Sequence, residues 1–175
     1  MQRYLRAFGP ATIRDLQAWS GLGGLRDTIE RLRKRLRVFH SEAGQELFDL
    51  PDAPRPRADT PSPPRFLPEF DNLLLSHADR TRVVRPEHQA TMWDGRMLFG
   101  TVLIDGFAGA RWKLVRARGA ATIVVRPFVR LTGADRTALL EEGARLCAFV
   151  ASDAANRDVV IEARSARGEG RGARR

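Results

Sequence analysis

The stretch "TIRDLQAWSGLGGLRDTIERLRKRLRVFHSEAGQELFDL", residues 12–50, carries the pattern that decides the fold of the first part of this chain. Thr12 and Asp15 form a capping-box pattern, in which the hydroxyl and the carboxylate each satisfy a backbone N–H. This pattern predicts a helix from Ile13 to about Ser20, with Trp19 on its inward face. The three glycines that follow predict a turn.

After that turn, apolar residues recur at helical spacing and predict a further helix with one buried stripe. They are Leu25, Ile29, Leu32 and Leu36. The segments "RVFH" and "ELFDL" then predict two short strands joined at residues 41–44. Upstream, Tyr4, Leu5 and Phe8 predict a short helix that Gly9-Pro10 ends. Three helices followed by a hairpin predict a winged-helix domain over residues 1–50.

In a winged helix, the third helix enters the major groove of DNA and the hairpin touches the backbone beside it. Basic side chains cluster on and after this predicted helix, as phosphate contacts require. The candidates are Arg26, Arg31, Arg33, Lys34 and Arg37. Two other interpretations stay open, because basic residues also line solvated helix faces and small three-helix units also dock proteins.

The whole chain is strongly basic, with a formal net charge of +9 and an isoelectric point near 11.2. Such an excess favours a polyanionic partner through counterion release, and double-stranded DNA is the leading candidate. Of the 30 basic residues, 28 are Arg, so a compositional bias toward Arg, Ala and Gly is the alternative explanation.

Six prolines in residues 51–65 favour extended backbone and predict a linker between two domains. Residues 66–164 predict an α+β domain. It begins with an antiparallel meander of three strands, with turns at 105–106, 108–109 and 118–119. A helix follows, which begins at a second capping box formed by Thr132 and Asp135. Residues 158–163 predict a last strand, and 165–175 a disordered basic tail. The expected DNA contacts on the meander are Arg111, Lys113 and Arg116.

The sequence disfavours disulfides, metal sites and a membrane location. A single cysteine, Cys147, rules out an intrachain disulfide and a cysteine-based zinc cluster, and it fits a reduced cytoplasmic setting. His77 has neither of the other histidines at a metal-binding spacing, so we expect no metal and no cofactor. No apolar run approaches the roughly 20 residues that span a bilayer, so we expect no membrane association.

The stretch "RFLPEFDNLLLSHADRTRV", residues 65–83, concentrates polar side chains around an apolar run. They are Glu69, Asp71, Asn72, His77, Asp79 and Arg80. One hypothesis is a hinge, in which Leu67, Phe70, Leu73 and Leu74 dock the segment into the core while Asp71 and Asn72 bind backbone groups. The other is that these polar side chains line a DNA channel.

The segments "LPEFDNLLLSHADRTRV", "GTVLIDGFAGARWKL" and "VRPF", together with "YLRAFGPATIRDLQAWSGL", resemble the bacterial winged-helix DNA-binding family that includes the AlkZ-type crosslink-repair DNA glycosylases. The resemblance covers nearly all of residues 1–164. It implies tandem winged helices followed by a β-rich domain around DNA, and excision of damaged bases without a metal. This chain resembles the C-terminal half of such proteins, so a partner chain that supplies the other half is one expectation.

The glycosylases of this family use a Gln-x-Gln or Gln-x-Asp motif, and the chain departs from that pattern. None of its four glutamines is followed two residues later by Gln or Asp, so no catalytic residue can be transferred. Two functions remain: a DNA-binding protein without catalysis, or a minimal glycosylase that uses Glu69, Asp71 or Asp79. A winged helix that docks proteins is a third, weaker option.

Overall fold

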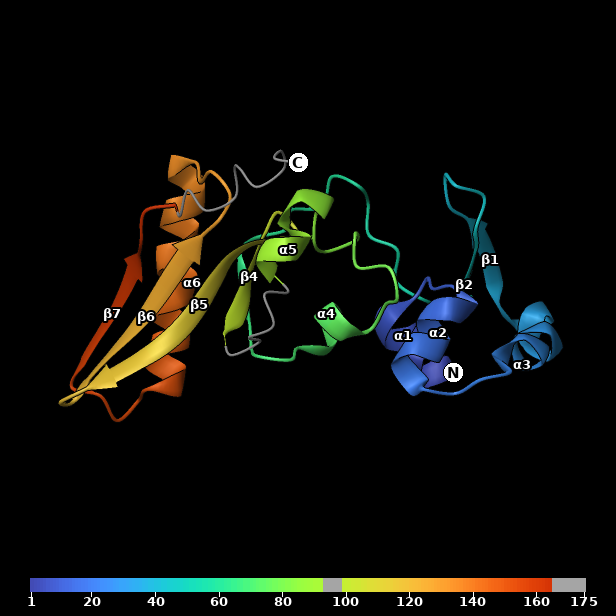
Figure 1. Cartoon of the computed structure of the whole chain (residues 1–175), viewed down its shortest axis with the longest axis horizontal. Coiled ribbons are helices and arrows are strands. Elements are labelled where there is room, and N and C mark those ends of the chain that lie inside the picture. Colours follow the sequence, from blue (N-terminus) through green and yellow to red (C-terminus); the bar gives the residue numbers. More distant parts are fainter. Residues whose placement is uncertain (93–98, 165–175) are drawn as a thin grey trace, which may run out of the picture. The chain divides into compact units, whose positions relative to one another are not determined.

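The computed structural model describes residues 1–92 and 99–164 (Figure 1). The segment 165–175, for which a disordered tail was predicted, lies outside the described residues. The chain folds into two compact units, the first formed by residues 1–60 and 71–80 and the second by residues 61–70 and 81–175. The sequence-based division assigned residues 71–80 to the second domain, whereas in the structure they pack with the first unit.

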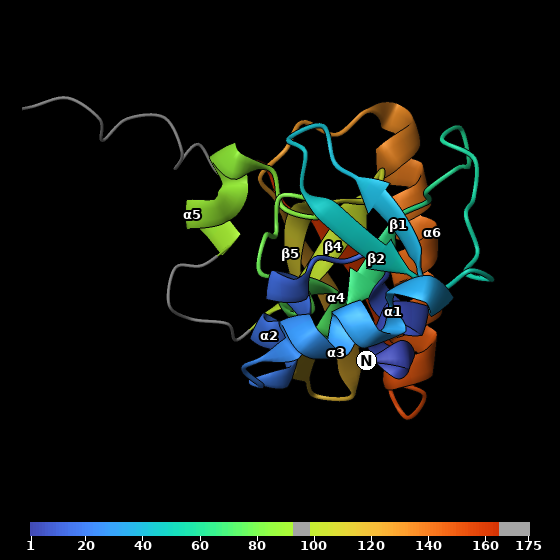
Figure 2. The same cartoon turned by 90° about the vertical axis from the view of Figure 1, so that its right-hand side faces the viewer.

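The first unit contains four α-helices, one 3₁₀ turn and a two-stranded antiparallel sheet among the described residues. The elements are α1 (Gln2–Phe8), α2 (Ile13–Ser20), α3 (Leu25–Leu32), η1 (Arg33–Arg35), β1 (Arg37–His40), β2 (Glu46–Asp49) and α4 (Asn72–Leu75). Strands β1 and β2 pair from Arg37↔Asp49 to His40↔Glu46. In Figure 2 the first three helices gather beneath this hairpin. The order of α1, α2, α3, β1 and β2 is the predicted one, whereas α4 was not predicted.

Helix α2 has the predicted bounds because both halves of its capping box form: the Thr12 hydroxyl accepts the Asp15 N–H, and the Asp15 carboxylate accepts the Thr12 N–H. Helix α3 is shorter than predicted. It ends at Leu32 and a 3₁₀ turn follows, because Leu36 must adopt the extended conformation that starts strand β1. Pairing of β1 with β2 therefore outweighs the helical spacing of Leu36.

The core of the first unit is built from residues of α1, α2, α3 and β2. Its buried members are Tyr4, Leu5, Ala11, Leu16, Ile29, Phe48 and Leu50. The prediction that Trp19 faces inward was wrong, since its side chain is 47% exposed. Its ring is tilted by 51° to that of Tyr4, with ring centroids 5.3 Å apart, so α1 covers only part of the indole.

The second unit contains a five-stranded mixed sheet and the long helix α6. Its elements are β3 (Arg65–Leu67), η2 (Pro86–His88), α5 (Gln89–Met92), β4 (Gly100–Ile104), β5 (Phe107–Ala117), β6 (Ala120–Pro127), α6 (Gly133–Val150) and β7 (Asn156–Ile161). The strand order is β3-β4-β5-β6-β7. The predicted antiparallel meander is β4–β6, and β7 joins it in parallel, since α6 returns the chain to the same end of the sheet.

Two of the three predicted turns are present, and the third is not. Asp105-Gly106 and Arg118-Gly119 connect the meander strands with positive φ angles, as tight hairpin turns require. Residues 108–109 instead lie within β5. Gly109 packs closely there, because a Cβ atom at this position would approach Ile104 Cδ1 to 2.7 Å and this side chain would have to shift. This glycine thus marks close packing and not a turn.

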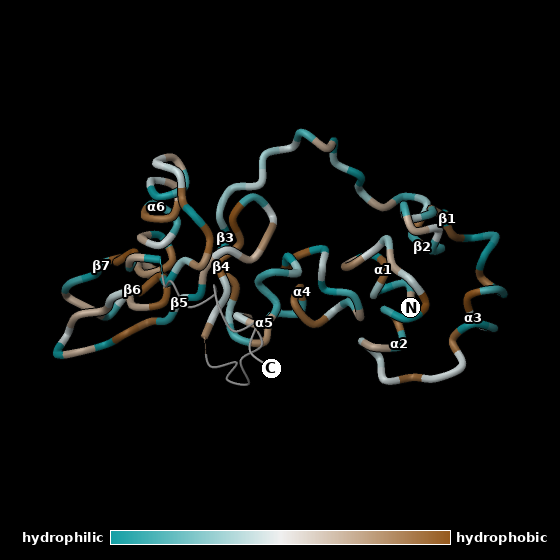
Figure 3. Tube along the Cα trace, turned by 45° about the horizontal axis from the view of Figure 1, so that its top comes forward, coloured by the Kyte–Doolittle hydropathy of each residue, from teal (hydrophilic) through white to brown (hydrophobic). Residues whose placement is uncertain are grey.

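Helix α6 covers one face of the sheet and begins at the predicted capping box of Thr132 and Asp135. Its buried residues Leu139, Gly143 and Cys147 pack with the strands in a core that includes Ala121, Ile123 and Val125. The hydropathy colouring of Figure 3 shows hydrophobic segments in this helix and in the strands beside it. The alternate side chains of β5 and β6 point to the opposite face of the sheet.

Candidate nucleic-acid interface

The candidate DNA-binding residues of the first unit lie on three consecutive elements. Arg26 and Arg31 are exposed on α3, and Lys34 is exposed in the 3₁₀ turn η1. Arg37, which the helical pattern placed on the third helix, is instead the first residue of strand β1. The basic surface of this unit therefore extends from the end of a helix onto the hairpin.

Arg33 is held by intramolecular ion pairs. Its guanidinium lies 3.3 Å from the Glu30 carboxylate and forms two hydrogen bonds with Glu46 on strand β2. The hydrogen bond from Arg33 lowers the pKa of Glu46, and Glu46 in turn raises the pKa of Arg33. Both carboxylates compete with a phosphate for the same donors, so Arg33 ties the 3₁₀ turn to the hairpin.

An aromatic ring positions two further guanidinium groups of the first unit. The Cζ atom of Arg37 lies 5.2 Å from the centroid of the Phe39 ring, and that of Arg55 lies 5.4 Å from it. Arg55 also pairs with the buried Asp49 at 3.2 Å and donates to the carbonyl of Leu50 at 2.6 Å. Arg55 thus fastens the chain after β2, while the exposed Arg37 places positive charge on the hairpin.

The three candidates of the second unit lie on β5 but not on one face. Arg111 and Lys113 are at odd positions and point away from α6, whereas Arg116 points toward it. The Arg116 guanidinium lies 2.9 Å from both carboxylate oxygens of Asp153 and donates to the Val150 carbonyl at 2.6 Å. The hydrogen bonds from Arg116 lower the pKa of Asp153, and the three bonds together join β5 to the end of α6.

On the sheet face opposite α6, Arg111 is half-buried, and its Cζ atom lies 3.8 Å from the centroid of the Phe99 ring. Lys113 is exposed on the same face. Arg126, directly opposite Arg111 on β6, was missed by sequence reasoning and pairs with Glu162 at 2.7 Å. This pair lowers the pKa of Glu162, to which the charge of Lys113 also contributes.

The net charge is divided unequally between the units. The residues of the first unit include twelve basic and ten acidic side chains, and those of the second include eighteen basic and eleven acidic. Seven of the nine net positive charges therefore belong to the second unit. The sequence pattern predicted DNA contacts on the third helix of the first unit, but most of the net positive charge that attracts a polyanion belongs to the second unit.

The polar residues of the stretch 65–83 are divided between the units. Glu69 is exposed and belongs to the second unit, whereas Asp71, Asn72, His77, Asp79 and Arg80 belong to the first. Asp71 caps helix α4, since its carboxylate accepts the Leu73 N–H at 2.8 Å. Asn72 and Asp79 are exposed, and Arg80 is half-buried. The structure does not bring Glu69, Asp71 and Asp79 together as an acid–base set within either unit.

His77 has a structural environment in the first unit. Its side chain is only 7% exposed, its Nε2 lies 3.0 Å from the carbonyl of Phe8, and its Nδ1 lies 2.9 Å from the Ser76 hydroxyl. Since a carbonyl only accepts hydrogen bonds, Nε2 carries a proton. The Tyr4 hydroxyl also donates to the Ser76 carbonyl at 2.6 Å. These bonds hold the segment 71–80 against α1.

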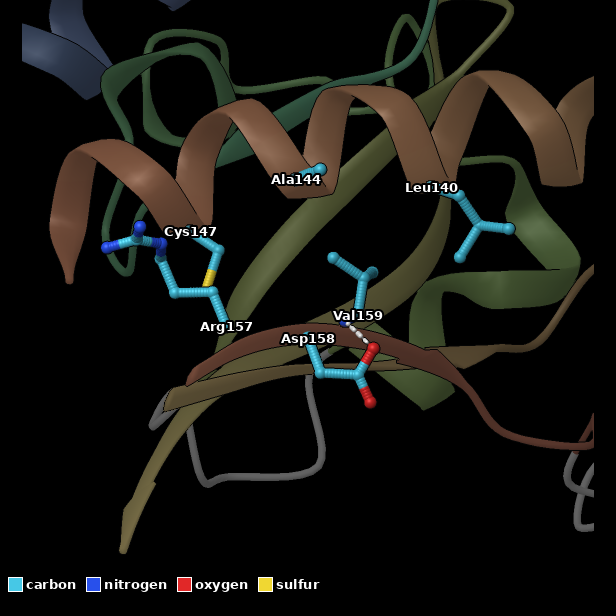
Figure 4. A pocket seen from close by; sticks show the side chains of 6 residues that line it. All are labelled: Leu140, Ala144, Cys147, Arg157, Asp158 and Val159. Carbon is cyan, nitrogen blue, oxygen red and sulfur yellow. Dashed lines mark hydrogen bonds between the residues drawn. The ribbon is translucent and has the colours of Figure 1, made fainter. Parts of the chain in front are cut away.

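A cavity of about 380 Å³ lies between α6 and the edge strand β7 (Figure 4). Its lining residues are Leu140, Ala144, Cys147, Arg157, Asp158 and Val159. The Cys147 thiol donates weakly to the Ala121 carbonyl at 3.6 Å, and Asp158 accepts the Val159 N–H at 2.8 Å. The mostly apolar lining and its single carboxylate do not form the polar pair that glycosidic hydrolysis needs.

Within residues 1–92 and 99–164, no group of three or more His, Cys, Asp or Glu side chains is arranged to hold a metal ion. In the same residues, no helix is long and apolar enough to cross a membrane.

Comparison with known proteins gives two matches. The sequence model of the AlkZ-like family, described as "DNA glycosylase AlkZ-like", matches residues 1–149. The solved structure of the Streptomyces sahachiroi DNA glycosylase AlkZ matches 92% of this chain with 25% sequence identity and a TM-score of 0.72. That match covers 44% of the glycosylase, so this chain spans less than half of its length. The curated protein sequences contain no significant match.

Proposed function

Because the chain belongs to the AlkZ-like DNA glycosylase family, we propose that it is a DNA-binding protein of DNA repair that holds double-stranded DNA without excising bases itself. In this proposal residues 1–50 act as a winged helix, residues 51–65 as the linker, and residues 66–70 and 81–164 as the second DNA-binding domain, since residues 71–80 pack in the first unit. The bacterial cytoplasm is the proposed location.

The observation that carries this proposal is the exposed basic side chains on both units of a protein from a DNA glycosylase family. In the first unit, Arg26, Arg31, Lys34 and Arg37 follow one another along α3, η1 and β1. In the second, Lys113 lies on the sheet face that α6 does not cover, in a unit with a net charge of +7. Phosphate contacts from such residues bind DNA without marked sequence preference.

The absence of excision is proposed for two reasons. No glutamine in the sequence has the Gln-x-Gln or Gln-x-Asp spacing of the glycosylases that this chain resembles. The carboxylate of Asp71, one of the candidate substitutes, already accepts a backbone hydrogen bond as a helix cap. A partner chain that supplies further parts of an AlkZ-like protein is part of the proposal, since the chain spans 44% of the solved glycosylase.

The binding test measures the affinity of the purified chain for a fluorescent duplex over a range of salt concentrations. We expect the affinity to fall by about tenfold to a thousandfold between low and physiological salt, as contacts to three to six phosphates imply. A duplex of unrelated sequence should give the same curve. An affinity that does not change with salt, or no binding at low salt, would contradict the proposal.

The alternative function is a DNA glycosylase, and the family membership is the observation that favours it. The two functions are separated by incubating the chain with duplexes that carry N7-alkylated guanine and then assaying for abasic sites. We expect no release above spontaneous depurination. The glycosylase function would be established if the wild-type chain released the alkylated base, the Asp71→Asn variant did not, and the circular dichroism spectra of the two were the same. This variant is informative because asparagine can still cap the helix but carries no charge.

A further inference from the structure

Phe70 has a backbone conformation that its residue type disfavours. Among the described residues, three that are not glycine have a positive φ angle: Phe70 (58°), Asp105 (50°) and Arg118 (47°). The last two precede glycines in the hairpin turns of the meander, where the turn requires this geometry. Phe70 lies in no hairpin. A left-handed conformation of a bulky residue is uncommon and points to a functional constraint.

Burial of the ring does not offset this strain. The Phe70 side chain is 57% exposed, although the sequence pattern predicted that it docks into the core. Of the four apolar residues predicted to dock, Leu74 is buried, with an exposed fraction of 3%. An exposed ring on a strained backbone gains little from the fold of the chain itself.

The segments on either side of Phe70 are each held within their own unit. Upstream, Leu67 pairs with Thr101 in the sheet, and its carbonyl accepts the indole N–H of Trp112 at 2.8 Å. Downstream, the Asp71 carboxylate caps α4 through the Leu73 N–H. The contacts of Leu67 anchor the segment that carries Phe70 to the sheet of the second unit, which lowers the entropy cost of binding through this ring.

We propose, on the basis of the function proposed above, that Phe70 is a base-binding residue that stacks on an unpaired nucleobase of the bound DNA. Aromatic rings stack on bases of any sequence, and this suits a protein whose other contacts are to phosphates. The neighbours Glu69 and Asp71 are acidic, which disfavours a phosphate at this position. The face of a base is the part of DNA that an apolar ring between two carboxylates can accept.

The test compares two duplexes of the same sequence, one fully paired and one with a single bulged adenine, at one salt concentration. We expect the wild-type chain to prefer the bulged duplex and the Phe70→Ala variant to lose this preference, with an affinity for the bulged duplex about fivefold to a hundredfold lower. Phe149, which is 84% exposed on α6, provides the matched control. Phe149→Ala should retain the preference.

A second variant separates strain from binding. Phe70→Gly should raise the melting temperature, because glycine adopts positive φ angles without a steric cost, and it should also lose the preference for the bulged duplex. The control is Asp105→Gly, which removes the strain of a positive φ angle in a hairpin turn. This variant should still prefer the bulged duplex.

Four results would overturn the inference. They are a wild-type chain that binds both duplexes equally, a Phe70→Ala variant that keeps the preference, an equal loss of affinity for both duplexes, and a lower melting temperature of Phe70→Gly. A wild-type chain that binds neither duplex would refute the proposed DNA binding itself, and this inference with it.

Discussion

The carboxylate of Asp15 accepts a hydrogen bond from the backbone N–H of Ala78 at 2.9 Å, although the two residues are 63 positions apart. Its other oxygen accepts the N–H of Thr12 at 2.8 Å and so completes the capping box of α2. The side chain is only 4% exposed. One buried carboxylate therefore both starts a helix and fastens the distant segment 71–80 to it.

This double role predicts unequal effects of the same substitution in the two capping boxes. Asp15→Ala removes the cap and a buried charge-assisted hydrogen bond, and we expect it to destabilise the first unit by about 2–4 kcal/mol. Asp135→Ala removes only the exposed cap of α6, at a cost of about 1 kcal/mol. Chemical denaturation followed by amide hydrogen exchange in each unit measures both values. Equal costs would show that the bond to Ala78 contributes nothing.

The position of residues 71–80 predicts where the chain can be shortened. A fragment of residues 1–60 lacks the segment 71–80, whose hydrogen bonds to Tyr4, Phe8 and Asp15 are then lost, so we expect broad, poorly dispersed amide resonances. A fragment of residues 1–80 restores these partners and should give a dispersed spectrum. The measurement is a two-dimensional amide correlation spectrum of each fragment. A well-dispersed spectrum of the shorter fragment would contradict the role of this segment.

Two basic residues of β5, one exposed and one held in an ion pair, allow a controlled test of which side chains bind DNA. Lys113→Ala should weaken binding to all duplexes and reduce the slope of log affinity against log salt by about one, as loss of one phosphate contact predicts. Arg116→Ala should leave this slope unchanged, because Asp153 and Val150 already engage its guanidinium. Salt titrations of both variants test the prediction. An equal loss of slope would mean that the ion pair with Asp153 opens when DNA binds.

The ion pairs predict how stability depends on pH. Arg33 lowers the pKa of Glu46 from its ordinary value of 4.5, so the folded state binds this proton more weakly than the unfolded state does. The stabilisation is therefore present above pH 4.5 and is lost as the pH falls through the lower folded-state pKa. Melting temperatures from pH 7 to pH 3 should show a smaller acid decrease in Glu46→Gln than in the wild type. Identical curves would refute the contribution of this pair.

Features with a local cause could be predicted from the sequence. The capping boxes at Thr12 and Thr132 each depend on residues three positions apart, and both helices begin where these pairs predict. The strands "RVFH" and "ELFD" and the turns at 105–106 and 118–119 are local in the same sense.

Features that depend on distant residues could not be predicted in this way. Helical spacing extended the third helix to Leu36, but this residue is extended and leads into strand β1, which pairs with β2. The second acceptor role of Asp15 and the burial of His77 depend on contacts across more than sixty residues, which leave no local signature. Among the candidate DNA contacts, Arg33 and Arg116 were singled out by charge alone, and their carboxylate partners become evident only in three dimensions.

The assignment of residues 61–70 to the second unit and 71–80 to the first also limits how this protein can exchange parts with its relatives. A single recombination crossover at residue 60 would separate α1 and α2 from the segment that Tyr4 and Asp15 hold, and one at residue 80 would remove strand β3 from the sheet. An intact first unit can be inherited alone only through several simultaneous crossovers. Gene shuffling should therefore pass the two units on together, as one block.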